Sequence, residues 1–296
     1  MSAKNLVDRA RAALDEGDGS LSGLGLERLA GGMSHAVFAP IEDPALVVKV
    51  FARDLYEEPA REWEALVALA GSGLAPEPVH YGAGSAATVV VMTRVTGVSL
   101  SAGELGERHA VLLGGAHRRV HAMSPSARRP LSHSWVRAAA EALRSSAAAR
   151  GPDGASAIFA ASWAAARDWV IRVDVDAILS SHETCFSRGD PNLTNYLWSG
   201  DRVALIDWEN SGTTDPVLEL ADFAEHASTR VMADAFWDAL ADATGLGTSD
   251  RGRISSARRL MTCFWLVLVA SRQRQGRPTT VTLDEQAERT LSVLDR

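Results

Sequence analysis

The sequence predicts an α+β protein with two lobes, a small N-lobe rich in β-strands and a larger helical C-lobe. Short strand-like runs separated by turns dominate the chain up to residue 96, and long alanine-rich helical runs dominate it from residue 97. The 296 residues provide enough chain to bury a core without help from disulfides or metals. We therefore expect an N-lobe over residues 1–96 and a C-lobe over residues 97–296.

The N-lobe is expected to open with a helix at residues 2–14, a run of helical composition that ends before a Gly/Ser-rich break. A second helix is expected at residues 57–70, because Gly71 and Gly73 follow it and end it. Around this helix we expect five strands, at residues 26–30, 36–40, 45–51, 78–81 and 88–95. Residues 31–35, a loop of mostly small side chains, join the first two strands as a hairpin.

The C-lobe is expected to consist mainly of helices, at residues 104–123, 134–150, 155–181 and over most of the chain from residue 229. Two short strands interrupt these helices, at residues 195–198 and 203–206. The turn Ser199-Gly200-Asp201 joins the two strands as a hairpin.

The charge balance argues against a nucleic-acid or anionic-membrane partner, since 37 acidic residues against 30 basic ones give a net charge of −7. The charged N-terminal segment lacks the apolar run of a secretion signal, and the most apolar stretch, residues 260–270, is too short to cross a bilayer. Cys185 and Cys263 match no metal-binding spacing and are interpreted as buried thiols. We therefore expect a cytoplasmic protein without a membrane partner.

Lysine is scarce in this chain, and one of its two lysines occupies an unusual position. Of the 30 basic residues, only Lys4 and Lys49 are lysines. Lys49 lies in the run Val47-Val48-Lys49-Val50-Phe51, which is expected to be a strand. A compact ammonium group kept there, where arginine is otherwise the rule, indicates a task that the larger guanidinium group cannot perform.

A carboxylate and amide pattern in the C-lobe is typical of phosphoryl transfer from a nucleotide to a hydroxyl group. That reaction needs one carboxylate to accept the hydroxyl proton and oxygen ligands to hold magnesium against the phosphates. Asp190 is the candidate catalytic base. Asn195, five positions later, and Asp207, after the expected hairpin, are the candidate Mg²⁺ ligands, with the spacing of kinase catalytic and metal loops.

The N-lobe supplies the nucleotide-binding side of the same pattern in the expected order. The loop with Gly32, Met33 and Ser34 is expected to fold over the phosphates of ATP or GTP through its backbone amides. Lys49 is expected to contact these phosphates, and Glu62 on the next helix is expected to hold the lysine in place. Main-chain groups of the last N-lobe strand are expected to read the edge of the base, at Met92, Thr93 and Val95.

Over nearly its whole length the sequence resembles the aminoglycoside phosphotransferase family, kinase-like small-molecule phosphotransferases that include antibiotic-resistance and choline kinases. The motifs that carry the resemblance are Gly32-Met33-Ser34, Val48-Lys49-Val50, Arg61-Glu62-x3-Leu66-x2-Leu69, Val91-Met92, Gly189-Asp190-x4-Asn195, Ile206-Asp207-Trp208 and Asp215-Pro216. The resemblance implies a protein-kinase-like fold and the same roles for Asp190, Asn195, Asp207, Lys49 and Glu62. It also implies that Ser34 contacts phosphate.

Two positions depart from the family pattern. The usual histidine before Gly-Asp is Arg188, and the usual aspartate four residues after Asp215 is Glu219. Both changes keep a polar side chain, so they concern how the catalytic loop is braced. His117 and His121 stand four apart on an expected helix, but Arg118-Arg119 replaces the glutamate of the metalloprotease pattern, and we interpret them as an ordinary helix face.

The expected acceptor is a small, cationic molecule with a hydroxyl group. An acidic set follows the metal aspartate and would attract such a molecule, at Glu209, Asp215, Glu219, Asp222 and Glu225. The resemblance implies an antibiotic of the aminoglycoside type. Nucleoside or peptide antibiotics, metabolites of the choline or homoserine type, and a nucleotide-binding pseudokinase without catalysis remain alternatives. A monomer and a homodimer are both open.

Overall fold

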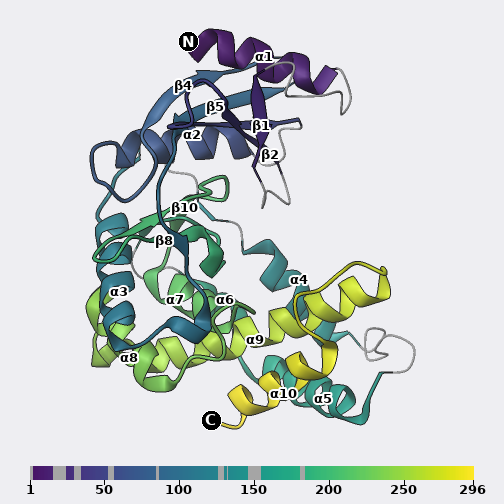
Figure 1. Ribbon diagram of the computed structural model, residues 1–296. Helices are drawn as coiled ribbons and strands as arrows, with labels where there is room; N and C mark the ends of the chain where they lie inside the picture. The colour runs from purple at the N-terminus through teal and green to yellow at the C-terminus, as the bar shows by residue number, and fades with distance from the viewer. Residues whose placement is uncertain are drawn as a thin grey trace.

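The chain forms an N-lobe built on an antiparallel sheet and a C-lobe built on helices (Figure 1). The structure, a computed structural model, describes residues 3–15, 25–29, 35–52, 57–84, 87–125, 130–131, 133–145, 155–180 and 184–296. The N-lobe elements are α1 (Ala3–Asp15), β1 (Leu26–Arg28), β2 (Ala36–Pro40), β3 (Leu46–Phe51), α2 (Glu58–Leu69), β4 (Pro78–Gly82) and β5 (Thr88–Thr93). The N-lobe elements predicted from the sequence are therefore confirmed to within a few residues at their ends.

The N-lobe sheet separates two apolar faces. Its strand order is β1-β2-β3-β5-β4, and every neighbouring pair is antiparallel. Because side chains alternate along a strand, Val89 and Val91 pack toward α1, whereas Val90 and Met92 join the core that includes α2. Figure 1 shows α1 on the outer side of the sheet and α2 on the side that faces the C-lobe.

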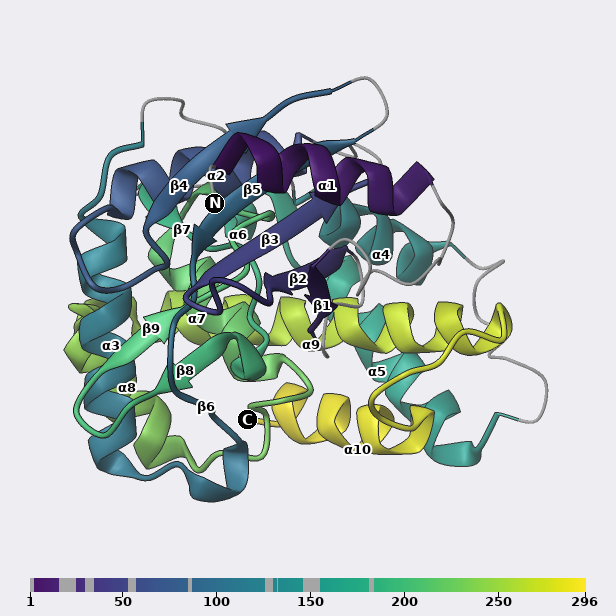
Figure 2. The same cartoon turned by 45° about the horizontal axis from the view of Figure 1, so that its top comes forward.

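The C-lobe begins with β6 (Val98–Ser99), and its helices accompany one two-stranded and one three-stranded sheet. The helices are α3 (Glu107–His121), α4 (Ser134–Arg144), α5 (Ala157–Arg172), α6 (Val175–Leu179), α7 (Pro216–Glu225), α8 (Asp234–Thr244), α9 (Arg251–Arg274) and α10 (Leu283–Leu294). Three 3-10 turns accompany them, at Ala102–Glu104, Leu193–Asn195 and Thr248–Asp250. In Figure 2, α9 crosses the lobe with α4 and α10 on opposite sides of it, and it also packs against α7.

The helix at residues 248–274 meets the length and composition of a membrane span, and among the described residues it alone does so. Leu260, Met261 and Leu266 on this helix are buried within the C-lobe core. Its apolar character therefore has a packing explanation, because the helix lies between α4, α7 and α10.

Two differences from the expected elements have local causes. The helix expected at residues 155–181 is divided into α5 and α6, because the Asp174 side chain accepts a hydrogen bond from the Ala177 N–H and caps a new helix. The strands β7 (Cys185–Ser187) and β10 (Gly212–Thr214) were not predicted. Each contains three residues, too few for an alternating pattern to be visible in the sequence. The helix α7 and the two-residue strand β6 were not predicted either.

These two strands place the functional loops beside each other. β7 and β10 are antiparallel, with Ser187 opposite Gly212. The chain that leaves β7 therefore passes the chain that approaches β10. In addition β8 (Tyr196–Trp198) and β9 (Val203–Leu205) form the predicted hairpin, to which β6 adds a third strand.

Candidate active site

Lys49 lies in the middle of the N-lobe sheet and points to the side of the C-lobe. Its backbone pairs with Val37 on β2 and Val90 on β5. Val48 and Val50 face α1, so the alternation along β3 turns Lys49 to the opposite face. The side chain is 7% exposed and its ammonium group is surrounded by carboxylates. The predicted strand position of Lys49 is confirmed.

Glu62 connects this lysine to the C-lobe. One oxygen, Oε2, accepts hydrogen bonds from Lys49 Nζ at 2.9 Å and from the Trp208 backbone N–H at 2.9 Å. The preceding residue on α2, Arg61, donates from Nη1 to the Ser211 carbonyl oxygen at 2.7 Å. The Ser211 hydroxyl donates in return to the Arg61 carbonyl oxygen at 3.1 Å. The helix α2 is thus bonded to the segment that follows Asp207, and the predicted pairing of Glu62 with Lys49 is present.

Asp207 comes from the opposite lobe and meets the same ammonium group. Its Oδ1 lies 2.5 Å from Lys49 Nζ across 158 positions of sequence. Its backbone has φ 66°, a left-handed conformation that aspartate and asparagine tolerate better than most residues. This turn directs the carboxylate of Asp207 into the space between the lobes.

Glu209 also belongs to this cluster around Lys49. The sequence analysis had placed Glu209 only among the residues that attract the acceptor. Its Oε2 lies 2.6 Å from Lys49 Nζ, and its side chain is 7% exposed. No regular spacing in the sequence identifies it, because Asp207 has a left-handed backbone and Glu209 lies in a turn, so strand alternation does not relate the two carboxylates. Trp208, between them, is buried and donates from Nε1 to the Leu205 carbonyl oxygen at 2.9 Å.

The charges of this cluster support one another. Burial alone lowers the pKa of Lys49, but the carboxylates of Glu62, Asp207 and Glu209 outweigh burial and hold the pKa above its ordinary value. Burial raises the pKa of Asp207, and the charge of Lys49 outweighs this and brings the pKa below its ordinary value. For Glu209, burial raises the pKa to about 7 although Lys49 opposes the shift. The cluster therefore keeps a permanent cation between carboxylates.

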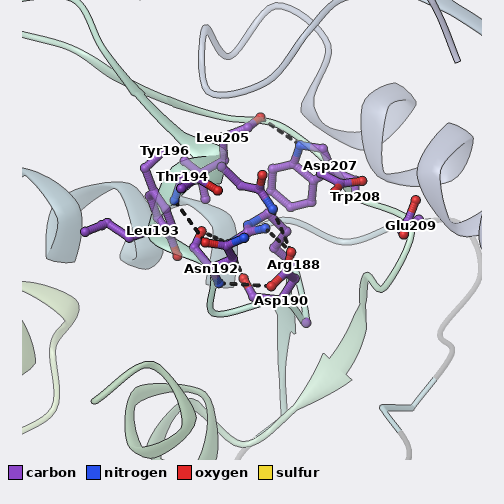
Figure 3. A network of polar contacts seen from close by, with 12 residues as sticks. Arg188, Asp190, Asn192, Leu193, Thr194, Tyr196, Leu205, Asp207, Trp208 and Glu209 are labelled. Carbon is purple, nitrogen blue, oxygen red and sulfur yellow. Dashed lines mark hydrogen bonds and ion pairs between the residues drawn. The ribbon is translucent and has the colours of Figure 1, made fainter. Parts of the chain in front are cut away.

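The loop after β7 holds Asp190 in one orientation (Figure 3). The Asp190 Oδ1 atom accepts from the Asn192 backbone N–H at 2.9 Å, and Oδ2 accepts from Asn195 Nδ2 at 2.6 Å. This bond uses the amide nitrogen of Asn195 and leaves its amide oxygen available to a metal ion. Gly189, with φ 74°, permits the tight turn, because a Cβ there would collide with the Asn210 carbonyl oxygen.

The last N-lobe strand offers a free main-chain donor near its end. The Thr93 backbone N–H donates to the Glu77 carbonyl oxygen at 2.9 Å, and the Arg94 N–H donates to Ala45 at 2.6 Å. Within the described part of the chain, the Val95 N–H donates to no backbone carbonyl. Of the three predicted positions, Val95 therefore has a donor available for the edge of a base. Met92 lies beside it and is 5% exposed.

Two cavities meet at Asp190. A cavity of about 570 Å³ is lined by residues of both lobes, among them Lys49, Asp207, Asn195, Asp190, Met92 and Val95. A second cavity of about 420 Å³ is lined mainly by C-lobe residues, with Glu58 and Arg61 of α2, and Asp190, Glu209 and Asn210 line both cavities. Asp190 is therefore accessible from both cavities. A group that acts between two bound molecules needs such access.

The predicted acidic set divides into two groups in the structure. Glu209, Glu219 and Asp222 line the second cavity. Asp215 and Glu225 do not, and the expectation that they attract an acceptor is wrong. Asp215 forms an ion pair with Arg253. Glu225 forms ion pairs with Arg258 and with Arg289, and both of these distances are 2.8 Å. Both carboxylates are buried and brace α7 against other helices of the C-lobe.

Asp222 differs from the other acidic residues of the second cavity. Glu209 is paired with Lys49, Glu219 with His117 and His121, Asp190 with Arg188, and Glu58 of α2 with His35. Among the described residues, Asp222 has no cationic partner within salt-bridge distance. Burial, followed by repulsion from Asp190, raises the pKa of the half-buried Asp222 carboxyl group to about 7. A cation bound in this cavity could therefore pair with Asp222, whose carboxyl group forms no ion pair with a described residue.

His117 and His121 were expected to form an ordinary helix face, and this expectation is wrong. Both turn into the C-lobe toward one carboxylate oxygen, Oε2 of Glu219, which lies 3.3 Å from Nδ1 of His117. The hydroxyl of Ser187 donates to the other oxygen of Glu219. Each contact is a hydrogen bond, and Tyr196 Oη at 3.0 Å from His117 Nε2 extends the network. The cluster therefore braces the start of the loop that carries Asp190.

Gly32, Met33 and Ser34 lie outside the described residues. Their predicted contacts with phosphate stay predictions. The adjoining strand β2 and the described residue His35 belong to the N-lobe at the same end of the sheet as Lys49, since β2 pairs with β3 from Ala36 opposite Val50.

Comparison with known proteins gives a family and a fold. A family model described as "Phosphotransferase enzyme family" matches residues 25–255. No curated protein matches the chain. Many solved structures do, and three of them are described next.

A choline/ethanolamine kinase family protein from Mesorhizobium loti is 22% identical, with a TM-score of 0.67 over 98% of this chain and 95% of that one. Choline kinase LicA from Streptococcus pneumoniae is 16% identical, with a TM-score of 0.61 over 97% of this chain and 99% of that one. A thermostable mutant of aminoglycoside phosphotransferase APH(4)-Ia, in complex with AMP-PNP and hygromycin B, is 16% identical, with a TM-score of 0.60 over 96% of this chain and 97% of that one. These likenesses confirm the predicted kinase-like fold.

Proposed function

Because the chain belongs to the phosphotransferase enzyme family, we propose that it transfers the γ-phosphate of ATP or GTP to a hydroxyl group of a small, cationic molecule. The position of Asp190 at the junction of the two cavities carries this proposal. The cavity shared by the lobes would hold the nucleotide, and the C-lobe cavity would hold the acceptor. Asp190 would then lie between the acceptor hydroxyl and the transferred phosphate.

Each residue of the cluster has a role that its contacts support. Lys49, held by Glu62, binds the phosphates of the nucleotide. The Val95 N–H binds the edge of the base, and Met92 and Thr93 line the same cavity. The loop with Gly32, Met33 and Ser34 is proposed to cover the phosphates on the ground of the sequence alone. Asp190 aligns the acceptor hydroxyl and takes up its proton. Positioning of the two molecules supplies much of the rate, because the transition state of phosphoryl transfer is loose.

The residues around Asp207 fit a magnesium ion. Magnesium prefers oxygen ligands, and carboxylate oxygens of Glu62, Asp207 and Glu209 lie within 4.8 Å of one another. The amide oxygen of Asn195 is not used by its bond to Asp190, which is made through Nδ2. Asp207 and Asn195 are therefore the proposed ligands. When bound, the ion would neutralise negative charge on the nucleotide phosphates.

The carboxyl group of Asp222, which lacks a cationic partner among the described residues, supports a cationic acceptor. An ammonium group bound beside it would be attracted by Asp190 as well, and the apolar side chains of Trp135 and Phe264 line the same cavity. An aminoglycoside antibiotic is the acceptor that the sequence resemblance favours. A metabolite with one ammonium group, of the choline type, is the second candidate, because Asp222 is the one described C-lobe carboxyl group in the lining of this cavity that lacks a side-chain ion-pair partner.

A panel of acceptors tests the proposed reaction. Hygromycin B, kanamycin, choline and homoserine are each incubated with the protein and magnesium-ATP or magnesium-GTP, and the products are analysed by mass spectrometry. We expect one acceptor to gain the mass of one phosphoryl group. If ATP raises the melting temperature while no acceptor on the panel or in a wider set of amino alcohols gains mass, the non-catalytic alternative replaces this proposal.

Asp222→Asn is expected to weaken binding of a cationic acceptor without weakening that of the nucleotide. Removal of one charge at a partly buried site should raise the KM of the acceptor about 10-fold. For a quaternary ammonium acceptor, whose own charge does not titrate, the KM of the wild-type protein should fall as the pH rises through about 7, since Asp222 ionises there. The neighbouring carboxylates of Asp190 and Glu219 oppose this ionisation.

Stability provides the control for this variant. Because the pKa of Asp222 is raised in the folded protein, the folded state binds its proton more tightly than the unfolded chain does. Ionisation of Asp222 therefore lowers the free energy of unfolding as the pH rises toward about 7. Asp222→Asn should accordingly raise the melting temperature above that pH while it weakens acceptor binding. An unchanged acceptor KM would contradict the role of Asp222.

A further inference from the structure

We propose that Arg188 is a positioning residue for Asp190, and that its guanidinium group supplies both the orientation and a fixed positive charge to the catalytic loop. The inference rests on the proposed function, in which Asp190 is the catalytic base. It concerns a position where this chain departs from the family that it resembles. The evidence is the burial of Arg188, its contacts, and the network that holds it.

Arg188 is buried inside the loop that it precedes. The residue is 2% exposed, and its guanidinium carbon lies 4.9 Å from the centre of the Tyr196 ring. Figure 3 shows its head group turned toward Asp190 and Asn192. A side chain of this length would reach solvent from most surface positions. Here it is folded back against the loop.

The head group contacts Asp190 at two places. Nη2 donates to the Asp190 carbonyl oxygen, and Nη1 lies 3.3 Å from the carboxylate oxygen Oδ2. Nη2 also lies 3.4 Å from the Asn192 carbonyl oxygen. One planar group therefore holds the backbone and the side chain of Asp190 together. A histidine or a lysine cannot place two nitrogens side by side in one plane, so neither could donate to the Asp190 carbonyl oxygen and form the ion pair with its carboxylate in the same way.

The contact completes the set of groups that fix the carboxylate plane. Oδ1 is held by the Asn192 N–H, and Oδ2 is shared by Asn195 Nδ2 and Arg188 Nη1. The Asn195 bond can persist when the amide oxygen binds a metal ion, because it uses Nδ2, but it is lost if metal binding rotates the side chain. Arg188 would then be the side chain that keeps Oδ2 in position.

Arg188 itself is held by a closed series of polar contacts. Its guanidinium group stacks on Tyr196, whose hydroxyl contacts His117. His117 contacts Glu219, and the Ser187 hydroxyl donates back to Glu219 from the residue next to Arg188. Such outer contacts restrict the rotamers of a residue that must hold another one in place.

The charge and the unused donors of Arg188 also favour a functional role. The Nε and Nη1 atoms are buried and donate no hydrogen bond within the described part of the chain, so Nη1 meets Asp190 only as an ion pair. Burial of donors that are not satisfied costs free energy, so a purely structural brace would be served better by a smaller or apolar side chain. A guanidinium group stays charged at any physiological pH. It can thus offset the negative charge that approaches the loop with the nucleotide.

Arg188→Met and Arg188→Lys test this proposal, with Arg253→Met as the matched control. Arg253 also pairs with a buried carboxylate, that of Asp215, but Asp215 lines neither cavity of the candidate site. The assay is phosphoryl transfer to the acceptor identified by the panel, and hydrolysis of magnesium-ATP in its absence. For each variant we measure kcat, the KM for magnesium-ATP, the KM for the acceptor, and the melting temperature.

We expect Arg188→Met to lower kcat about 100-fold and to change each KM less than about 3-fold, as for loss of one preorganised electrostatic group. Arg188→Lys keeps the charge but not the fork, and should lower kcat about 10-fold. Arg253→Met should lower the melting temperature and leave kcat within about 2-fold. If Arg188→Met does not fold, Arg188→Lys decides the question by the same comparison.

Two outcomes would overturn the proposal. One is a kcat close to that of the wild type in a folded Arg188→Met or Arg188→Lys protein. The other is an equal loss of kcat in Arg253→Met, which would show that any damage to the C-lobe lowers the rate. A wild-type protein that neither transfers phosphate nor hydrolyses ATP would contradict the proposed function instead, so the two failures are distinguishable.

Discussion

Asp190→Asn is expected to lower kcat for phosphoryl transfer about 1,000-fold, within the range of a general base. The amide can still accept the hydrogen bond from the Asn192 N–H that Oδ1 accepts at 2.9 Å, so the loop should keep its shape. It cannot accept a proton from the acceptor hydroxyl. Binding of magnesium-ATP, measured by calorimetry, should stay within about 3-fold of the wild-type value, because the nucleotide is held mainly by other residues.

A second variant separates the loss of the base from a change at Asn195. In the wild type, Asn195 Nδ2 donates to the Asp190 Oδ2 atom at 2.6 Å. The amide that Asp190→Asn introduces can turn its own nitrogen toward this donor, and two donors would then oppose each other. Asp190→Ala has no such donor and should show the same loss of kcat. Asp201→Asn, on an exposed turn of the C-lobe, is the control and should be fully active. Transfer near the wild-type rate in either Asp190 variant would contradict its role as base.

Asp207→Asn is expected to lower kcat about 1,000-fold and to make the reaction depend on a higher magnesium concentration. A metal ligand contributes several kcal/mol of charge stabilisation to the transition state, and the neutral amide binds magnesium weakly. Asparagine tolerates the left-handed backbone at φ 66°, so the turn should persist. The measurement is kcat as a function of magnesium concentration at a fixed concentration of ATP.

Asp207→Asn also removes a negative charge beside Lys49. A control variant must separate this effect from the loss of a metal ligand. Lys49 Nζ lies 2.5 Å from Asp207, 2.6 Å from Glu209 and 2.9 Å from Glu62, and two carboxylates remain after the substitution. The lysine should therefore stay charged. Glu62→Gln removes a carboxylate from the same ammonium group and should weaken nucleotide binding with less change in the magnesium requirement. An Asp207→Asn protein with the magnesium dependence of the wild type would show that Asp207 is not a ligand.

Much of the N-lobe follows from local patterns that the sequence displays. β3 and β5 are visible in the chain as short runs of β-branched and other apolar residues, which are typical of strands buried on both faces. The rarity of lysine indicated a functional role for Lys49, and the spacing of Asp190, Asn195 and Asp207 predicted a catalytic base beside two metal ligands. The sequence analysis did not predict that the side chains of Asp190 and Asn195 meet. They do meet, at 2.6 Å.

The shortest elements and most of the buried polar contacts could not be predicted from the sequence. β7 and β10 contain three residues each, and a strand of that length is stabilised by its partner and not by its own composition. Glu209, Asp215, Glu219, Asp222 and Glu225 look alike as an acidic series. The structure separates those that line a cavity from those that arginines cover, because burial and pairing depend on helices that are distant in sequence.

The sequence by itself determined the order of the lobes, the strand that carries Lys49, and the motif with Asp190, Asn195 and Asp207, since each depends on residues near one another in the chain. Tertiary structure alone decided that Glu209 joins the lysine, that Asp222 lacks a cationic partner among the described residues, and that Arg188 is folded against Asp190. The physical reason is that the ion-pair partners of a buried charge are set by the elements that pack around it, and these elements can be distant in sequence. For Lys49 and Asp207 those partners are 158 positions apart.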